Sequence, residues 1–302
     1  MSETTTEQQP RPARVRRGEE LELRIDSLAQ GGRGVARTDD GFVVFVAGGL
    51  PGDHLRARVG KSKRSYAEAS VIELLEGAPE RIADRCVHGG EPCPGAAWQG
   101  LPYDLQLRHK QAQVTEALER LGGFEGADVE EIVPAVEEWR YRNKLEYSFG
   151  ADTAQDAPAL GFHARGRWDT VVDVDDCLLA SEANNAARNA IREWAATTGL
   201  PAYDRGGSEA GVLRNLVVRE GRRTGQLQTR LVTSQAEIPE PPVDLHTVVG
   251  RRAGNTDGPT GVLGEEYLRE RLGELDLRVS PFAFLQTNTE TCLLYTSDAA
   301  DE

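Results

Sequence analysis

The residues of this 302-residue chain that could do the widest range of chemistry are its four cysteines: Cys86, Cys93, Cys177 and Cys292. Thiolates bind soft metals and act as nucleophiles, whereas disulfides are rare in proteins of the cytosol. Met1–Pro10 is polar and acidic, unlike a signal peptide, and the most apolar window, Gly41–Leu50, is too short to span a bilayer. We therefore expect a cytoplasmic protein, in which this uneven spacing of cysteines indicates a metal site or a reactive thiol.

Charge is distributed unevenly along the chain. The net charge is −14, yet residues 11–70 carry 12 Lys and Arg against 8 Asp and Glu, a local balance of +4, which leaves −18 for the remainder. A basic segment in an acidic chain is where a phosphate-binding surface is expected. The alternative is a scatter of charge over an ordinary solvated surface.

Short runs separated by glycine-rich turns fill residues 19–75. Polar and apolar residues alternate in them, which is the pattern of a half-buried strand. Five such runs in so few residues predict a small closed barrel, a fold that binds oligonucleotides on one strand face and its bordering loops. The expected strands are Glu20–Ile25, Val35–Thr38, Phe42–Val46, His54–Val59 and Tyr66–Leu74.

The rest of the chain mixes helical and strand patterns. Residues 102–121 predict a helix that Gly122 and Gly123 end, and residues 181–198 predict a second helix capped by Ser181. Glu265–Leu272 is expected to form a short helix. Strands are expected at residues 145–150, 160–163, 168–174, 212–220, 226–232, 243–249 and 262–263.

The first 75 residues resemble a TRAM domain, an RNA-binding barrel of the OB type. The resemblance rests on Ile25–Ala36, Phe42–Val46 and Leu50–Asp53, where the glycines permit turns that a Cβ would block. On this barrel we expect contacts with phosphates and one aromatic ring that stacks on a base. These RNA-binding residues are Arg33, Lys61, Lys63, Arg64 and, for stacking, Tyr66. Solvated surface is the alternative for each of them taken alone.

Past the barrel the chain is similar to the TRAM-bearing RNA uracil-C5 methyltransferases, of the type that modifies 23S ribosomal RNA. Four motifs carry this resemblance in the family's order: Tyr141–Lys144, Asp176–Leu179, Leu213–Arg219 and Ser280–Asn288. The resemblance implies a monomer that binds RNA, ribosomal rather than transfer RNA. It also implies that S-adenosylmethionine (SAM) is the methyl donor and 5-methyluridine the product.

Many members of this family hold a [4Fe–4S] cluster on Cys-x5-Cys-x2-Cys and one distant Cys. Here six residues separate Cys86 from Cys93, Ala96 stands in place of the third cysteine, and Cys177 matches the distant ligand. The resemblance therefore implies three metal ligands, with His88 or a ligand from outside the chain as the fourth. The alternatives are that the cluster has been lost, or that the three thiols have no metal at all.

Three residues of the later motifs are candidates for binding. Gln286 matches a family position that contacts SAM, and an amide suits this role because it both donates and accepts hydrogen bonds. Arg142 and Lys144 are expected to face the RNA. The alternatives are a polar strand end for Gln286 and a strand start with an ion pair for Arg142.

The resemblance also implies a Rossmann-like SAM domain after Gln286, opened by a glycine-rich turn. No such turn follows, and Cys292–Glu302 resembles the translation of a transposase sequencing adapter. We therefore expect that domain to be missing, together with the family's nucleophilic Cys, which adds to uracil C6, and its Glu base. No catalytic residue is assigned, and weak RNA binding without turnover is expected.

The expected fold class is α+β: an N-terminal OB-like β-barrel (TRAM), a central mixed α/β domain, and a missing C-terminal Rossmann-like SAM domain. An RNA-binding module without catalysis is the alternative function. An iron–sulfur methylthiotransferase would need Cys-x3-Cys-x2-Cys, which the sequence lacks. The expected domains are a disordered tail (1–12), the barrel (13–76), a cysteine-containing loop and linker helix (77–125), the central domain (126–275), the start of the SAM domain (276–291) and the adapter-like tail (292–302).

Overall fold

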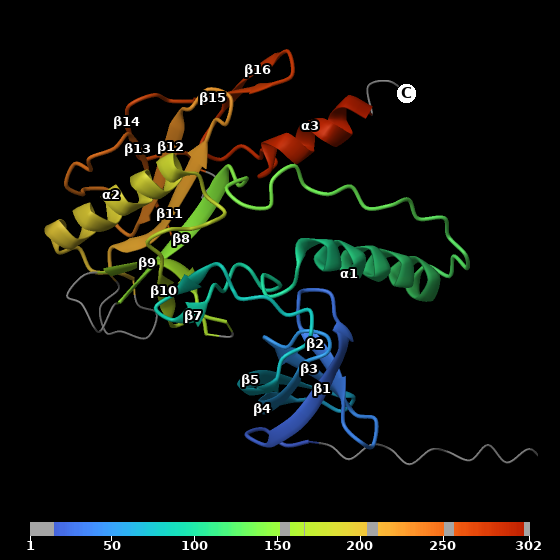
Figure 1. Ribbon diagram of the computed structural model, residues 1–302. Coiled ribbons are helices and arrows are strands. Elements are labelled where there is room, and N and C mark those ends of the chain that lie inside the picture. Colours follow the sequence, from blue (N-terminus) through green and yellow to red (C-terminus); the bar gives the residue numbers. More distant parts are fainter. Residues whose placement is uncertain (1–14, 152–157, 166, 204–210, 251–256, 299–302) are drawn as a thin grey trace, which may run out of the picture. The chain divides into compact units, whose positions relative to one another are not determined.

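The computed structural model of the protein describes residues 15–151, 158–165, 167–203, 211–250 and 257–298. The chain forms two compact units (Figure 1). The first comprises Met1–Arg85 and Ala96–Val133, and the second comprises Cys86–Gly95 and Pro134–Glu302. The short segment Cys86–Gly95 thus folds with the second unit although both of its flanks fold with the first. No helix in the described ranges is long and apolar enough to cross a membrane.

A closed barrel forms the core of the first unit, with the strand order β1-β2-β3-β5-β4. The alternating residues put one side of each strand inward, where Leu23, Val44 and Leu55 are at most 4% exposed. Burial of each such side chain contributes roughly 1.5–3 kcal/mol. The predicted barrel is confirmed. Its strands are β1 (Glu20–Leu28), β2 (Gly34–Arg37), β3 (Val43–Ala47), β4 (His54–Ser62) and β5 (Tyr66–Glu76).

Helix α1 (Tyr103–Glu116) continues into a π-helical turn at Ala117–Leu121, which confirms the helix predicted over residues 102–121. Its apolar side chains are not buried, since Val114 is 51% and Leu121 80% exposed. Instead, Gln113 Nε2 donates to the backbone oxygen of Leu28 at 2.9 Å. A polar contact therefore connects this helix to the barrel of its unit.

A seven-stranded sheet carries most of the described part of the second unit, in the order β10-β9-β8-β11-β12-β13-β14. Helix α2 (Glu182–Thr198) packs Ile191 and Trp194 into the core beside it. As predicted, the hydroxyl of Ser181 caps this helix, accepting from the Asn184 N–H at 3.1 Å. The strands are β8 (Lys144–Ala151), β9 (Pro158–His163), β10 (Val171–Asp173), β11 (Leu213–Glu220), β12 (Leu227–Thr233), β13 (Leu245–Val249) and β14 (Gly261–Leu263).

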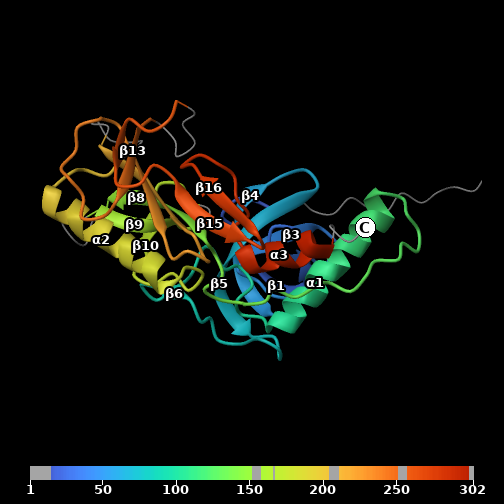
Figure 2. The same cartoon turned by 90° about the horizontal axis from the view of Figure 1, so that it is seen from above.

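Neighbouring strands of this sheet are antiparallel except for β12 and β13, which are parallel. Figure 2 shows α2 along one face of the sheet. Two short ribbons and a final helix belong to the same unit. They are β6 (Val87–His88) with β7 (Glu91–Pro92), β15 (Leu268–Leu272) with β16 (Leu275–Val279), and α3 (Thr289–Asp298).

The short helix predicted at Glu265–Leu272 is wrong, because β15 occupies most of this range and pairs with β16. Glu270 is the physical reason. Its carboxylate is fully buried and accepts from the backbone N–H groups of Arg222 and Arg223 at 2.7 and 3.0 Å, which an exposed helix would not allow. Gly273, with a φ of 57°, makes the tight turn between the two strands.

The residues after β16 pack into the second unit. Arg219 donates to the backbone oxygens of Ser280 and Ala283 at 3.1 and 2.7 Å, and α3 follows. The fold-class prediction of a missing C-terminal Rossmann-like SAM domain is corrected here. It took residues 276–291 as the start of that domain, whereas Ser280 and Ala283 are held in the second unit by the buried Arg219 of β11.

We expect Asp53→Ala to destabilise the barrel strongly. Asp53 is fully buried, pairs with Arg81 at 3.0 Å, and accepts from the backbone N–H groups of Leu50 and Ala78 at 2.8 and 3.0 Å. Its loss leaves these donors without an acceptor, which costs about 3–5 kcal/mol. Urea unfolding followed by circular dichroism measures this change.

Asp104→Ala is the matched control for this experiment. Asp104 forms an exposed pair with Arg108 one helical turn away, and such pairs contribute less than about 1 kcal/mol. Equal losses of stability in the two variants would contradict the role given to Asp53.

Candidate metal centre and nucleic-acid interface

A short hairpin brings two cysteines together. Gly89 and Gly90 join β6 to β7 with φ values of 58° and 86°, which suit the two-residue turn of a hairpin. The Cys93 N–H donates to the Cys86 oxygen at 3.0 Å, so the two residues stand opposite each other at the base of the hairpin. The six-residue gap that differs from the family spacing is therefore the length of this hairpin.

Three donor atoms gather at that base. The sulfurs of Cys86 and Cys93 and an imidazole nitrogen of His88 lie within 4.8 Å of one another, and 3.4 Å separates Cys86 Sγ from His88 Nε2. All three residues are buried. Burial lowers the pKa of His88, which favours the neutral imidazole that binds metals. This cluster can hold a metal ion.

Cys177 lies on a loop that Arg140 and Asn185 hold in place. Arg140 Nη1 donates to the Cys177 oxygen at 3.0 Å, and Asn185 Oδ1 accepts from the Cys177 N–H at 2.9 Å. Burial raises the pKa of Cys86 to about 11, more than the opposing hydrogen bond from the backbone of Leu178 lowers it. Burial likewise raises the pKa of Cys177. Since Leu178 follows Cys177 directly, this loop and the hairpin meet.

The [4Fe–4S] prediction does not fit this donor set. Such a cluster takes four cysteine ligands, and position 96 is alanine. Each cysteine would also bind a different iron, whereas Cys86, Cys93 and His88 converge on one point. No disulfide joins any of the four cysteines. The iron–sulfur cluster therefore remains without support, and no function is derived from it.

On the barrel, two of the cations predicted to meet phosphates share one carboxylate. Arg33 Nη1 lies 2.9 Å and Lys61 Nζ 3.4 Å from the two oxygens of Glu68. The hydrogen bond from Arg33 lowers the pKa of Glu68, so this carboxylate stays ionised near neutral pH. Both cations are about half exposed, at 46% and 53%. A phosphate reaching them would compete with Glu68.

The turn before β2 presents Arg33. Gly32 has a φ of 85°, and a Cβ on it would lie 2.8 Å from Trp98 Nε1, so only glycine fits there. The Ala29 N–H donates to the Arg33 oxygen at 2.8 Å and closes the turn. The glycines of the TRAM-like motif thus position a cation as well as a bend.

Lys63 and Arg64 are exposed in the turn between β4 and β5. The Lys63 N–H donates to the Tyr66 oxygen at 2.8 Å, which fixes this turn. Tyr66 is half-buried and meets the edge of Phe45, with ring centroids 5.5 Å apart and planes at 75°. The described barrel therefore places cations and a partly accessible aromatic ring on neighbouring strands.

A groove beside these residues adds two cations that the sequence analysis did not single out. Arg16 and Arg17 line it together with Lys61. Their signal in the sequence was the basic balance of residues 11–70, which names no single residue. The groove can accommodate an anionic chain.

In the second unit, Asn143 joins two of the sequence motifs. Its N–H donates to the Thr287 oxygen, and its Nδ2 donates to the Gln286 oxygen and to Thr289 Oγ1, each at 2.8 Å. Asn143 is fully buried, whereas the Gln286 side chain is exposed. The amide predicted to contact SAM therefore stands at the surface on a fixed backbone.

Several cations surround this junction. Arg142 Nε donates to the Lys144 oxygen at 3.0 Å, which is a backbone contact in place of the ion pair that was the alternative. Burial and then the charges of Arg219 and Arg230 lower the pKa of Lys144. Burial lowers the pKa of Arg219 to about 10.

The buried guanidiniums of Arg219 and Arg230 donate hydrogen bonds to neutral carbonyl oxygens and not to carboxylates. Arg230 donates to the Pro281 oxygen, and its guanidinium lies 4.7 Å from the centroid of the Phe282 ring. The carbonyl oxygens accept from the terminal N–H groups, while the Nε of each arginine has no partner among the described residues, and the positive charge stays in place. Three basic residues, Lys144 at the start of β8 with Arg219 and Arg230, therefore lie close enough to influence one another.

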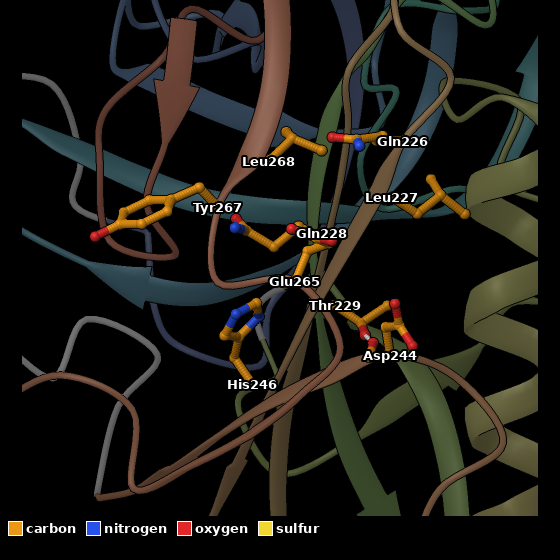
Figure 3. A pocket seen from close by; sticks show the side chains of 9 residues that line it. All are labelled: Gln226, Leu227, Gln228, Thr229, Asp244, His246, Glu265, Tyr267 and Leu268. Atoms are coloured by element: carbon orange, nitrogen blue, oxygen red, sulfur yellow. Dashed lines mark hydrogen bonds between the residues drawn. The ribbon is translucent and has the colours of Figure 1, made fainter.

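A small cavity of about 150 Å³ lies beside β12 and β13 (Figure 3). His246, which is 3% exposed, points into it, and neither ring nitrogen has a hydrogen-bond partner among the described residues. Gln228, Glu265 and Tyr267 also line it. No local sequence pattern indicates this cavity, because its walls come from separate segments. It has room for several water molecules.

Comparison with known proteins gives matches of three kinds: to a family model, to curated proteins and to solved structures. Residues 14–72 match the family model of the TRAM domain. Two uncharacterized RNA methyltransferases, from Chlorobaculum tepidum and Halalkalibacterium halodurans, are 37% and 31% identical over 91% and 94% of this chain. The crystal structure of the Pyrococcus abyssi tRNA (uracil-54, C5)-methyltransferase in complex with S-adenosyl-L-homocysteine aligns with a TM-score of 0.68 and 26% identity.

These alignments cover about nine-tenths of this chain but slightly less than two thirds of the relatives' length. The Pyrococcus structure matches 90% of this chain and 65% of its own length, and the first two relatives are covered to 63% and 64%. These matches, which take in about nine-tenths of the residues present, give no support to the expectation of a missing C-terminal domain. The expectation of no turnover rested on that missing domain and loses its basis as well.

We expect Glu68→Gln to strengthen RNA binding. The change removes the carboxylate that competes with phosphate for Arg33 and Lys61. Affinity for a single-stranded RNA should rise roughly two- to fivefold at low salt, because exposed ion pairs are worth up to about 1 kcal/mol. Fluorescence anisotropy over a series of salt concentrations measures this effect.

Glu73→Gln on the same strand is the control, since Glu73 pairs with Arg56 at 2.6 Å and not with the predicted RNA-binding residues. A weaker affinity of the Glu68 variant, or an equal gain in both variants, would count against this surface.

We expect Asn143→Ala to loosen the segment around Gln286. The variant leaves the partly buried backbone oxygen of Gln286 and the Thr289 hydroxyl without their donor, which costs about 1–3 kcal/mol. Amide hydrogen exchange at residues 286–292 should accelerate, as measured by mass spectrometry. Asn189→Ala, which removes an exposed bond to the Asp175 oxygen, should leave that exchange unchanged.

Proposed function

We propose that this protein takes part in SAM-dependent methylation of uracil C5 in RNA. The observation that carries the proposal is similarity along the chain: it aligns over 91% of its length with one RNA methyltransferase and over 90% with a tRNA uracil-C5 methyltransferase. A TRAM-like barrel alone would support RNA binding, but it would not explain the match of the second unit.

RNA binds to the barrel in this proposal. Arg33, Lys61, Lys63 and Arg64 contact phosphates, and Tyr66 stacks on a base. The exchangeable pairs of Arg33 and Lys61 with Glu68 support this role, because phosphate can replace the carboxylate without leaving a buried charge unpaired.

Arg142 and Lys144, at the beginning of β8 in the second unit, provide further RNA contacts. Their support is the positive charge that Arg219 and Arg230 retain while bound to carbonyl oxygens. Gln286 contacts SAM through its exposed amide, which Asn143 holds in position through the backbone.

SAM supplies an electrophilic methyl group when bound. Attack by uracil C5 requires a nucleophile at C6 and a base that removes the C5 proton. Cys86, Cys93 and Cys177 are not proposed as this nucleophile, because all three are buried and the first two gather with His88 at the base of the hairpin.

Two measurements test the function. The protein is incubated with labelled SAM and unmodified transcripts of ribosomal and transfer RNA, and 5-methyluridine is quantified by mass spectrometry. We expect the ribosomal transcript to be the better substrate and the protein to sediment as a monomer. Methylation of transfer RNA only would correct the substrate, and RNA binding without any 5-methyluridine would favour the non-catalytic binding module.

We expect the Lys63→Ala and Arg64→Ala double variant to bind RNA more weakly. Each lost phosphate contact should reduce the slope of log affinity against log salt by about 0.7 to 1. Lys110→Ala, at an exposed position on α1, is the matched charge control. An unchanged slope in the double variant would rule out this turn as a phosphate contact.

A further inference from the structure

The ribbon of β6 and β7 is too short to be stable by itself. Each strand has two residues, and isolated two-stranded ribbons are marginal in water. Nevertheless Cys86–Gly95 folds with the second unit, and Figures 1 and 2 show the ribbon beside β10. An interaction stronger than two strand pairs is needed to keep this segment there.

The contacts that the described residues make at this point are polar. Arg165 Nη2 donates to the Cys93 oxygen at 3.3 Å, and the backbone of Leu178 forms a hydrogen bond with the Cys86 sulfur. Cys86, His88 and Cys93 are buried at 3%, 8% and 2% exposure, yet their polar atoms face one another instead of an apolar core. Side chains with metal-binding atoms therefore occupy the place where apolar side chains would otherwise pack and hold Cys86–Gly95 in the second unit.

Distances distinguish a single ion from a cluster. Tetrahedral zinc, with bonds of about 2.3 Å to sulfur and 2.0–2.1 Å to nitrogen, places its donor atoms roughly 3.5–3.8 Å apart. The 3.4 Å between Cys86 Sγ and His88 Nε2, and the spread of at most 4.8 Å among all three donors, fit one central ion. A four-iron cluster would hold its cysteines apart by the width of the cluster.

We propose that Cys86, His88, Cys93 and Cys177 bind one zinc ion, in place of the iron–sulfur cluster that the family resemblance implies. Three thiolates and one imidazole form a regular set for structural zinc. Cys177 supplies the fourth ligand from the loop that meets the hairpin, and it is 1% exposed. His88 replaces the cysteine that Ala96 does not provide.

Charge around the site agrees with this assignment. Three thiolates and a neutral imidazole on Zn²⁺ carry one net negative charge. Arg165 donates to the backbone oxygen of Cys93, and Arg140, which also pairs with Asp176, donates to that of Cys177, so both guanidiniums lie next to the ligand-bearing segments. Such outer partners orient metal ligands and stabilise their charge.

Metal analysis of the full chain tests the proposal. The protein is purified both with and without oxygen, and zinc, iron and acid-labile sulfide are quantified. We expect about one zinc per chain and no sulfide in either preparation. X-ray absorption at the zinc edge should show three sulfur ligands and one nitrogen ligand.

Single variants identify the ligands. Cys86→Ser and His88→Gln should each weaken zinc binding by more than the roughly 10- to 100-fold that loss of an outer partner costs. Cys292→Ser, in α3, and His163→Gln, at an exposed position of β9, are the matched controls and should keep full zinc content.

Chelator-stripped wild-type protein makes the test independent of how the variants fold. Titration with Co²⁺ should give the visible absorption of a tetrahedral thiolate site, and added zinc should displace the cobalt. Four irons with matching sulfide, a preparation without any bound metal, or an unchanged cobalt spectrum in the His88 variant would each overturn the proposal.

Discussion

Buried side-chain donors that bind backbone oxygens determine how the second unit holds its C-terminal segment. Asn143 reaches Gln286 across 143 positions of sequence, and Arg219 reaches Ser280 and Ala283. Hydrogen bonds are directional, and a buried donor left unpaired costs about 1–3 kcal/mol, so each bond specifies one position of the segment. Apolar packing alone tolerates small shifts. The exposed amide of Gln286 therefore has a defined place because the buried atoms beneath it do.

The two units use their cations differently, and the difference follows from burial. Arg33 and Lys61 are half exposed and pair with Glu68, so that an incoming phosphate exchanges one partner for another at little cost. Arg219 and Arg230 are buried and donate to neutral carbonyl oxygens. Their side chains therefore cannot turn outward to a phosphate, but their positive charge is not neutralised. An acidic chain can therefore still attract a polyanion at these places, since local potential and not net charge governs the encounter.

Strands and helices with a regular local pattern were predictable from the sequence. Contacts between residues far apart in the sequence were not. Alternation gave the five barrel strands, and Ser181 and the helical spacing after it gave α2. The helix expected at Glu265–Leu272 failed because the partners of Glu270 lie 47 and 48 positions away. Asn143 was passed over in favour of its charged neighbours for the same reason. The three cysteines were named as ligands, but only the fold shows that His88 and Cys93 approach Cys86, through a turn that Gly89 and Gly90 form.

The donor set at the hairpin also bears on what a metal would do there. In the proposed function, methyl transfer from a sulfonium to carbon exchanges no electrons with the protein, so the metal needs no redox chemistry. Zinc has none, and its binding in small structural sites is worth about 10–16 kcal/mol, far more than a ribbon of four residues can supply. Ala96 stands in place of the third cysteine of the family pattern, so one iron of a four-iron cluster would lack its protein ligand. A single ion bound by Cys86, Cys93 and Cys177 needs only one further donor. His88 meets that requirement because the hairpin turn follows it directly, which keeps its ring beside the Cys86 sulfur.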